Sequence, residues 1–331
     1  MQYRQFGQTE LSVSEIGFGG WAIGGPAKVG DLSIGWGNTD DTISVQAIAA
    51  AMDAGINFFD TADFYGLGHS ETLLGKVLQG NNDMLIATKV GQKRGEDGKV
   101  AIDYSYDYII QACENSLRRL QRDRIDFYQL HVARLQHLQQ GDCLRAMHDL
   151  MKAGKIRYWG ISLLTFQPEP EADFLLDHQG GHGFQLVFNL INQLALPVLM
   201  RAAAQGYGII ARMPLQFGLL SGKIRQDTRF SPDDHRSYRL VPEVTGPVYN
   251  ILQEKLVPMA ERYRTSLAGL ALSYLLSYPE VSVIIPGIRT PEQVAANTEH
   301  LVQLSADDKQ YLRDMYANDW LALMPLIQQR G

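Results

Sequence analysis

The sequence predicts an α/β protein built as a (β/α)8 barrel, the TIM-barrel architecture. Short apolar runs of strand type alternate along the chain with longer segments of helical spacing, which implies parallel strands joined by right-handed crossovers. Gly55, Gly154 and Gly206 follow three of the helical segments, where a residue with positive φ ends a helix. Eight such strands allow the sheet to close on itself, and an open doubly wound sheet is the alternative architecture.

The elements follow in a regular order. The chain opens on a short hairpin with arms at residues 3–6 and 11–13, on either side of a turn at Gly7. The expected barrel strands are residues 15–17, 57–60, 84–89, 125–131, 157–162, 185–189, 208–213 and 281–285. The expected helices are residues 41–54, 70–78, 104–120, 142–153, 171–178, 198–205, 248–263, 266–276 and 291–301.

Two further segments are less regular. Residues 223–247 are polar and rich in turn formers, and a long loop of this kind inside a compact domain is usually functional or mobile. Extra helices are expected at the C-terminal end, where the apolar residues 320–326 either pack on the barrel or cover its mouth.

We expect one domain over residues 1–331, because no Pro-, Gly- or Ser-rich linker divides the chain. Hydrophobic residues make up 45% of the sequence and charged residues 20%, so the chain can bury a large core. Lys and Arg total 30 against 36 Asp and Glu, a net charge of −6. This balance argues against a nucleic-acid or anionic-membrane partner, although a small basic pocket for a phosphorylated ligand remains compatible with it.

No run of residues reaches the ~18 apolar positions of a membrane span, and the first residues lack the apolar core of a signal peptide. We therefore expect a cytoplasmic protein without a membrane partner. Cys113 and Cys143 are too few for a disulfide framework or a four-thiolate zinc site. Both are expected to be reduced and buried.

Titratable side chains gather at the expected strand ends, where functional groups of such barrels lie. Asp60 follows two phenylalanines and Lys89 follows another apolar run, so both are expected to be buried and in need of partners. Each is the nearest candidate partner for the other. The alternative for Asp60 is a helix or loop cap.

Tyr65 gains interest from this pair, because an adjacent ammonium stabilises the phenolate form of a general acid. His131 ends the fourth strand, where a structural role is the alternative. Together Asp60, Tyr65, Lys89 and His131 suggest an acid–base device aimed at a carbonyl oxygen. No metal site is expected, because the histidines show no ligand spacing of the HExxH type.

Residues 17–22 fit a loose GxGxxA dinucleotide fingerprint after the first strand. A true fingerprint opens a helix, whose N-terminus holds the pyrophosphate. Gly24, Gly25 and Pro26 follow instead, so we interpret the segment as a glycine-rich loop that a ligand can approach closely.

The sequence resembles the aldo-keto reductase superfamily, in the branch that includes potassium-channel β-subunit-like reductases. The resemblance rests on FFDTADFYGLGHSE at residues 58–71, ATK at 87–89 and DFYQLH at 126–131, and extends to Asn297. It implies the (β/α)8 barrel, Tyr65 as general acid, Lys89 and Asp60 as the groups that tune it, and His131 as the residue that orients a substrate carbonyl. It also implies NADPH bound across the barrel mouth, with NADH as the alternative.

The resemblance assigns the cofactor to several segments. Ser162 and Gln185 correspond to contacts with the nicotinamide carboxamide, and residues 213–223 to the pyrophosphate loop. Arg289, just before a helix, favours a 2′-phosphate, with a solvated surface arginine as the alternative. The implied cofactor residues are Ser162, Gln185, Arg212, Pro214, Leu215, Gly218, Ser221, Lys223, Gly287, Arg289, Gln293 and Asn297.

This chain departs from the family pattern at several of these positions. Leu163 stands where an Asn is usual, and Arg212 stands where many members place an aromatic that stacks on the nicotinamide. A guanidinium plane also stacks. Gly287 and Gln293 replace a basic pair of the eukaryotic branch, which weakens the expectation of NADPH.

The expected function is reduction of an aldehyde or ketone, a small-molecule carbonyl substrate, with hydride from NADPH. Trp21, Trp36 and Phe64 are candidates for an apolar wall around the substrate, and core packing is the alternative for Phe64. The alternatives for function are an NAD(P)-dependent sugar or polyol dehydrogenase and a redox-sensing regulatory subunit. The oligomeric state is left open.

Overall fold

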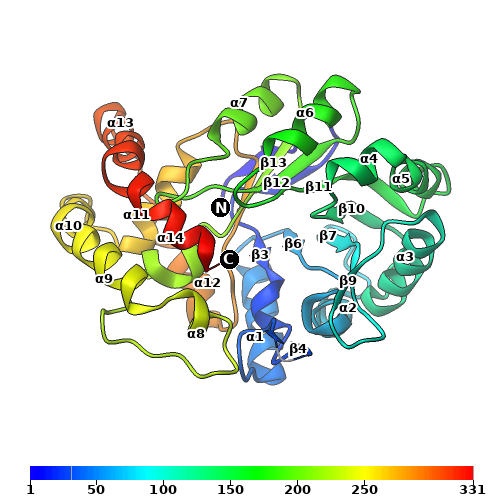
Figure 1. Ribbon diagram of the computed structural model, residues 1–331, viewed down its shortest axis with the longest axis horizontal. Coiled ribbons are helices and arrows are strands. Elements are labelled where there is room, and N and C mark those ends of the chain that lie inside the picture. Colours follow the sequence, from blue (N-terminus) through cyan, green and yellow to red (C-terminus); the bar gives the residue numbers. More distant parts are fainter. Residues whose placement is uncertain (31, 331) are drawn as a thin grey trace.

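The computed structural model describes residues 1–30 and 32–330 and confirms the predicted barrel. Eight strands form one sheet, and backbone bridges from Ile16 to Ile284 and from Gly19 to Gly287 join its two ends. Helices surround these strands (Figure 1). In barrel order the strands are β3 (Phe18–Gly19), β6 (Phe58–Asp60), β7 (Leu85–Val90), β10 (Ile125–His131), β11 (Ile156–Ser162), β12 (Gly183–Val187), β13 (Gly208–Arg212) and β14 (Val283–Ile285).

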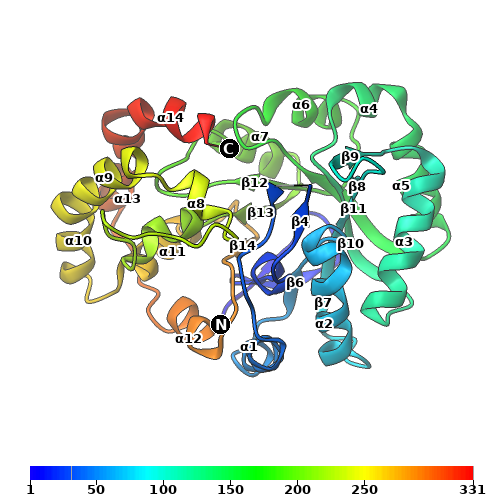
Figure 2. The same cartoon turned by 60° about the horizontal axis from the view of Figure 1, so that its bottom comes forward.

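The helices pack against the outside of the barrel and against one another (Figure 2). The first of them begins after Asp40, whose carboxylate accepts the backbone N–H groups of Thr42 and Ile43. The helices are α1 (Asp41–Asp53), α2 (His69–Leu78), α3 (Tyr106–Leu120), α4 (Leu135–Gln140), α5 (Asp142–Lys152), α6 (Glu169–Asp177), α7 (Leu196–Ala204), α8 (Arg236–Arg239), α9 (Pro242–Ile251), α10 (Val257–Arg262), α11 (Leu267–Leu276), α12 (Pro291–Thr298), α13 (Ala306–Met315) and α14 (Met324–Gln329).

Three antiparallel hairpins lie outside the barrel sheet. The first is the predicted N-terminal hairpin, and the sequence analysis did not predict the other two. These two hairpins follow β3 and β7, so both lie in loops at the C-terminal ends of barrel strands, where the candidate site also lies. The hairpins are β1 (Tyr3–Gln5) with β2 (Ser12–Ser14), β4 (Lys28–Val29) with β5 (Leu32–Ser33), and β8 (Gln92–Arg94) with β9 (Val100–Ile102).

The barrel interior has an apolar floor that the N-terminal hairpin closes. Phe6 stacks near Phe58 and meets Phe127 edge-on, with ring centroids 6.1 and 4.9 Å away. Three glycines on neighbouring strands allow close packing at this floor, and two of them lie against Phe6. A Cβ on Gly208 would lie 2.5 Å from the Phe6 ring, and one on Gly183 would lie 2.8 Å from it. Gly160 is equally tight, since its Cβ would lie 2.1 Å from the carbonyl oxygen of Gly183.

Two strand predictions are shifted along the chain. The first expected strand, residues 15–17, bridges β14 at Ile16, but the ladder to β6 begins only at Phe18. The sixth was expected at residues 185–189 and ends at Val187. Asn189 ends the extended run, because its side-chain oxygen accepts the backbone N–H groups of Ile191 and Asn192 and turns the chain.

Prolines explain the main errors in the helices. The single helix expected at residues 248–263 is divided by a π-helical turn at Leu252–Leu256, just before Pro258, which has no N–H to continue the ladder. Helices α6 and α7 begin earlier than predicted because Pro170 and Pro197 fit their first turns. Residues 223–247 are not irregular throughout, since they contain α8 and the start of α9.

Two further predictions concern the cysteines and a membrane-spanning helix. Cys113 and Cys143 are both buried and unpaired, as predicted. Within the described residues, no helix combines the length and the apolar character that a membrane span requires.

The floor of the barrel supports a stability prediction. Gly208→Ala forces a methyl group against Phe6 and should lower the free energy of unfolding by about 1–3 kcal/mol. Gly246→Ala is the matched control, because a Cβ there meets nothing within 4 Å and removes a glycine from α9. Urea denaturation of both variants checks this, and equal stability would show that the floor has room to spare.

Candidate active site

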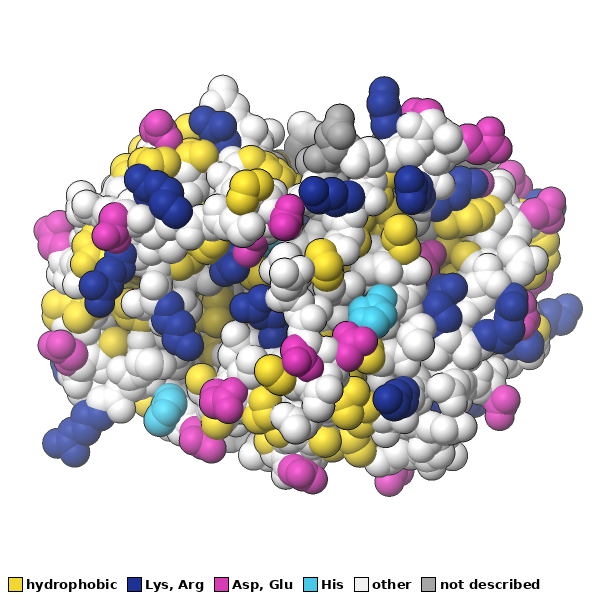
Figure 3. Space-filling model, turned by 90° about the horizontal axis from the view of Figure 1, so that it is seen from below, with side chains coloured by type: hydrophobic (Ala, Val, Ile, Leu, Met, Phe, Trp, Pro, Cys, Tyr) yellow, Lys and Arg dark blue, Asp and Glu magenta, His cyan; other side chains and the backbone are white. Residues whose placement is uncertain are grey.

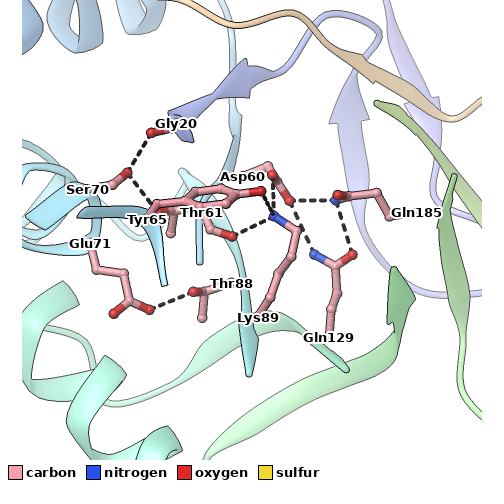
Figure 4. A network of polar contacts seen from close by, with 10 residues as sticks. All are labelled: Gly20, Asp60, Thr61, Tyr65, Ser70, Glu71, Thr88, Lys89, Gln129 and Gln185. Carbon is pink, nitrogen blue, oxygen red and sulfur yellow. Dashed lines mark hydrogen bonds and ion pairs between the residues drawn. The ribbon is translucent and has the colours of Figure 1, made fainter. Parts of the chain in front are cut away.

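The side chains predicted at the strand ends meet at one end of the barrel. Lys89 is fully buried, and its Nζ donates to Asp60 Oδ2 at 2.7 Å and to Tyr65 Oη at 3.1 Å (Figure 4). A third hydrogen bond goes to the carbonyl oxygen of Thr61 at 2.8 Å. Asp60 is therefore the counter-charge of Lys89, and the alternative of a helix or loop cap is wrong.

The charge state of Lys89 follows from this neighbourhood. Burial acts to lower the pKa of the ammonium, but the charge of Asp60, the Tyr65 oxygen and the hydrogen bonds to both outweigh it. The net result is a Lys89 pKa above its ordinary value. A permanent cation therefore lies against the Tyr65 phenol, with Nζ 4.6 Å from the ring centroid.

Tight backbone packing holds the loop that carries Tyr65. Gly66 has φ 62° and Gly68 has φ 98°, values that glycine adopts without strain. A Cβ on Gly66 would lie 2.0 Å from the carbonyl oxygen of Gly24, so the loop after β3 presses directly on the tyrosine loop. Both glycines are therefore required by the position of Tyr65.

Two buried residues at the start of α2 anchor the same loop. Ser70 Oγ donates to the carbonyl oxygen of Gly20 at 2.9 Å, and Thr61 Oγ1 donates to Ser70 Oγ at 2.8 Å. Glu71 accepts from Thr88 Oγ1 and from Arg119 Nε, both at 2.6 Å. This explains why the serine and glutamate follow the tyrosine motif in the sequence.

His131 is the last residue of β10, and its ring lies beside that of Tyr65. Its ring is nearly perpendicular to that of Tyr65, with centroids 5.9 Å apart, and its Nδ1 has no hydrogen-bond partner in the described part of the chain. Burial lowers the His131 pKa well below 6.5, and the positive charges of Lys89 and Arg212 lower it further. The imidazole is therefore neutral at neutral pH, and its Nδ1 is buried without a partner among the described residues.

Aromatic side chains form a wall beside the tyrosine. Trp21 stacks on Tyr65 with centroids 6.1 Å apart and planes 27° apart, and Trp36 meets Trp21 edge-on. The indole N–H of Trp21 donates to the carbonyl oxygen of Ile34, so this face of the wall is apolar. Phe64 is buried yet borders the cavity, which combines core packing with the predicted contact surface.

One cavity of about 920 Å³ joins the predicted catalytic and cofactor groups. The face drawn in Figure 3 is hollowed, with Lys and Arg side chains around the hollow. Tyr65 and Asp60 line the cavity, whereas Lys89, which hydrogen-bonds to both, does not. The predicted residues that line the cavity are Trp21, Asp60, Phe64, Tyr65, His131, Ser162, Gln185, Arg212, Pro214, Leu215, Gly218, Ser221, Lys223, Gly287, Arg289, Gln293 and Asn297.

The segment after β13 has a strained backbone. Met213, Gln216 and Phe217 all have positive φ, which is uncommon outside glycine. Asn189 supports the loop, donating to the carbonyl oxygen of Met213 at 2.9 Å and to Gln216 Oε1 at 2.8 Å. Gly218 follows with φ 95°.

Arg212 lies at the start of this loop and lines the cavity. Its guanidinium donates to the carbonyl oxygen of Leu163 and to Thr165 Oγ1, both at 3.1 Å. Burial lowers the pKa of this guanidinium. The Leu163 side chain packs in the apolar core, so the position after Ser162 presents no amide to the cavity.

The last strand leads to the third predicted segment. The backbone N–H of Arg289 donates to Gln293 Oε1 at 2.7 Å, which orders the start of α12. Burial and the charge of Arg236 lower the pKa of Arg289. Arg236 and Arg289 both line the cavity.

Residues 234–239 are a part of the site that sequence reasoning missed. His235 is fully buried, stacks on Trp21 with centroids 4.5 Å apart, and lines the cavity with Arg236 and Arg239. Burial lowers the His235 pKa to about 3, with the two arginines adding to the effect. The dense run of basic and aromatic residues there was the available signal.

Gln129 was also missed. It lies on β10 with no exposed surface and donates to Asp60 Oδ1 at 3.2 Å. The signal was a polar residue two positions before His131, hence on the same inward face of the strand.

Residues 15–317 match the family described as "Aldo/keto reductase family". Aldo-keto reductase YhdN of Bacillus subtilis is 31% identical over 90% of this chain and 88% of its own length. A probable voltage-gated potassium channel subunit beta of rice, Oryza sativa subsp. japonica, is 28% identical, with 91% of each chain covered.

A bacterial relative carries a cofactor preference in its name. The NADH-specific methylglyoxal reductase of Escherichia coli is 28% identical over 93% of this chain and 96% of its own length. Among solved structures, the holo form of aldo-keto reductase AKR11C1 from Bacillus halodurans superposes with a TM-score of 0.77, at 27% identity, covering 95% of this chain and 96% of that one.

The neutral state of His131 predicts how stability depends on pH. The unfolded chain takes up a proton at His131 below about pH 6.5, whereas the folded protein does so only at a much lower pH. Stability present above pH 6.5 is therefore lost as the pH falls from there toward the folded-state pKa, by up to ~1.4 kcal/mol per unit. His131→Gln should shrink the difference in unfolding free energy between pH 7 and pH 5.

Urea denaturation at the two pH values measures this difference. His148→Gln is the control, because His148 is exposed on α5 and water surrounds its ring in both states. An unchanged pH dependence in His131→Gln would show that His131 carries a proton in the folded protein.

Proposed function

The chain belongs to the aldo/keto reductase family, and we propose that it reduces the carbonyl group of a small aldehyde or ketone with Tyr65 as proton donor and NADPH as hydride source. The observation that carries the proposal is the buried Lys89, which hydrogen-bonds both Asp60 and the Tyr65 phenol at the surface of a large cavity. A phenol held against a buried cation is suited to give up its proton and to remain as a stabilised phenolate.

The charges of the cavity suit a phosphorylated dinucleotide. Four cations on its wall, Arg212, Lys223, Arg239 and Arg289, have no carboxylate partner among the residues that the structure describes. The one carboxylate on the wall, Asp60, is already paired with Lys89. An excess of unpaired cations on the wall of one cavity favours an anionic ligand. This supports NADPH, with NADH as the alternative.

We assign each part of the cofactor to a different segment of the cavity wall. We assign the pyrophosphate to the loop from Pro214 to Lys223, because this loop lines the cavity, has a positive φ at Gly218 and carries the Lys223 ammonium. Arg289 and Gln293 are assigned to the adenosine end, and Ser162 and Gln185 to the nicotinamide carboxamide. When bound, the cofactor supplies the hydride that the carbonyl carbon receives.

The protein supplies the proton and the orientation. Tyr65 Oη donates its proton to the carbonyl oxygen as negative charge develops there, and Lys89 compensates the phenolate that forms. His131, being neutral, directs a ring N–H at the same oxygen. Trp21 and Phe64 keep the space around the carbonyl apolar, which excludes water and favours a substrate with an apolar body.

Tyr65→Phe tests the proton donor. The variant keeps the ring that stacks on Trp21 and loses only the hydroxyl, so kcat for reduction of a panel of aldehydes and ketones should fall by about 10²–10⁴-fold. The dissociation constant for NADPH should stay within about two-fold, because the phenol is assigned to the substrate. A variant that keeps the wild-type rate would refute the assignment of Tyr65.

Arg289→Ala tests the 2′-phosphate contact. Loss of one charge-assisted hydrogen bond should raise the dissociation constant for NADPH by about 10-fold and leave that for NADH nearly unchanged. Arg225→Ala, an exposed arginine away from the cavity wall, is the control. Fluorescence titration with both nucleotides gives the comparison. Equal weakening of NADPH and NADH would show that Arg289 does not contact the 2′-phosphate.

A further inference from the structure

Gln129 is a buried amide for which the proposed reaction has no use. It lies on β10 between Phe127, which belongs to the barrel floor, and His131 at the mouth, and all three face the barrel interior. The strand register places it beside Lys89 on β7. A fully buried amide at this level of the barrel needs partners for both its N–H groups and its carbonyl oxygen.

Asp60 accepts from one N–H of Gln129, and Gln185 donates to the Gln129 carbonyl oxygen. Asp60 Oδ1 accepts from Gln185 Nε2 at 2.7 Å and from Gln129 Nε2 at 3.2 Å, while Oδ2 accepts from Lys89 (Figure 4). The second N–H of Gln185 goes to Gln129 Oε1 at 3.2 Å. The four side chains therefore form one closed network.

The network leaves no freedom in how the amides are turned. Asp60 is paired with Lys89 and is a carboxylate, so it only accepts, and both glutamines must turn their NH₂ groups toward it. Gln185 then spends one N–H on Asp60 and the other on Gln129. Any hydrogen bond between the Gln185 side chain and a ligand in the cavity must be accepted by its Oε1.

We propose that Gln129 is a positioning residue that locks the Gln185 amide, so that the site recognises the NH₂ group, and not the carbonyl oxygen, of the nicotinamide carboxamide through Gln185. This inference rests on the proposed function, because it assumes that a nicotinamide lies beside Gln185. It adds Gln129 to the residues of the site. An amide fixed in one orientation selects one rotamer of the carboxamide and thereby helps to hold the ring in a single pose.

Two NADPH analogues test the direction of the hydrogen bond. In the thionicotinamide analogue the NH₂ group is kept, and in the 3-acetylpyridine analogue a methyl group replaces it. The wild-type protein should bind the thionicotinamide analogue about as tightly as NADPH. It should bind the acetylpyridine analogue about 5–10-fold more weakly, which is the loss of one neutral hydrogen bond.

Gln129→Met tests the positioning role. Without Gln129, one N–H of Gln185 is freed and the amide is held only by Asp60, so discrimination against the acetylpyridine analogue should fall below about two-fold. Gln111→Met is the control, because Gln111 is exposed on α3, away from the cavity wall, and should leave the discrimination unchanged. Binding of 2′,5′-ADP, which lacks the nicotinamide, should be the same in all three proteins and reports that each is folded.

The outcomes separate the two proposals. Absence of NADPH binding to the wild-type protein would overturn the proposed function. Tight NADPH binding with equal affinity for the acetylpyridine analogue would overturn the inference about Gln185 alone. Wild-type discrimination that persists in a folded Gln129→Met variant would overturn the role of Gln129.

Discussion

The buried ion pair between Lys89 and Asp60 is the interaction on which the rest of the site depends. Removing two charges from water is costly, and the pair is stable only because further hydrogen bonds satisfy both groups. Lys89 also donates to Tyr65 and to a backbone carbonyl, and Asp60 accepts from two amides. Loss of either charge would leave the other buried without compensation, at a cost of about 3–5 kcal/mol. The ion pair therefore orients Tyr65 and the two amides, and their hydrogen bonds in turn stabilise the buried charges.

The barrel places this polar layer directly above an apolar one. Along β10, Phe127, Gln129 and His131 face inward in succession, so one strand passes from the floor to the amide layer to the mouth. The hairpin carrying Phe6 closes the floor from below, and glycines on β12 and β13 give the Phe6 ring room. Water is thus excluded beneath the ion pair and admitted only from the cavity side. This geometry lets a cation remain buried yet touch a reacting group.

The sequence predicted the barrel because its main signal, alternation of apolar strands and amphipathic helices, is local. It also predicted the pairing of Asp60 with Lys89, since two buried charges of opposite sign at adjacent strand ends have few other partners. The π-helical turn before Pro258 was not predicted, because the sequence does not show whether a proline ends a helix or only changes its hydrogen-bond pattern. The segment containing His235 was missed because its partners, Trp21 and Trp36, are about 200 residues away and polar loops carry no periodic signal. Gln129 was not predicted because the sequence does not show that the side chain of this one polar residue in an apolar strand faces the barrel interior.

The central claim is that the buried ammonium of Lys89 makes Tyr65 an effective proton donor for carbonyl reduction. Its most direct test is Lys89→Met, which keeps an unbranched side chain, shorter by one heavy atom, and removes its charge. Binding of 2′,5′-ADP, which lacks the nicotinamide assigned to Gln185, reports that the variant is folded. The account predicts that NADPH still binds and that kcat for reduction falls at least about 100-fold. A folded, NADPH-binding Lys89→Met protein that reduces its substrate at the wild-type rate would contradict the account.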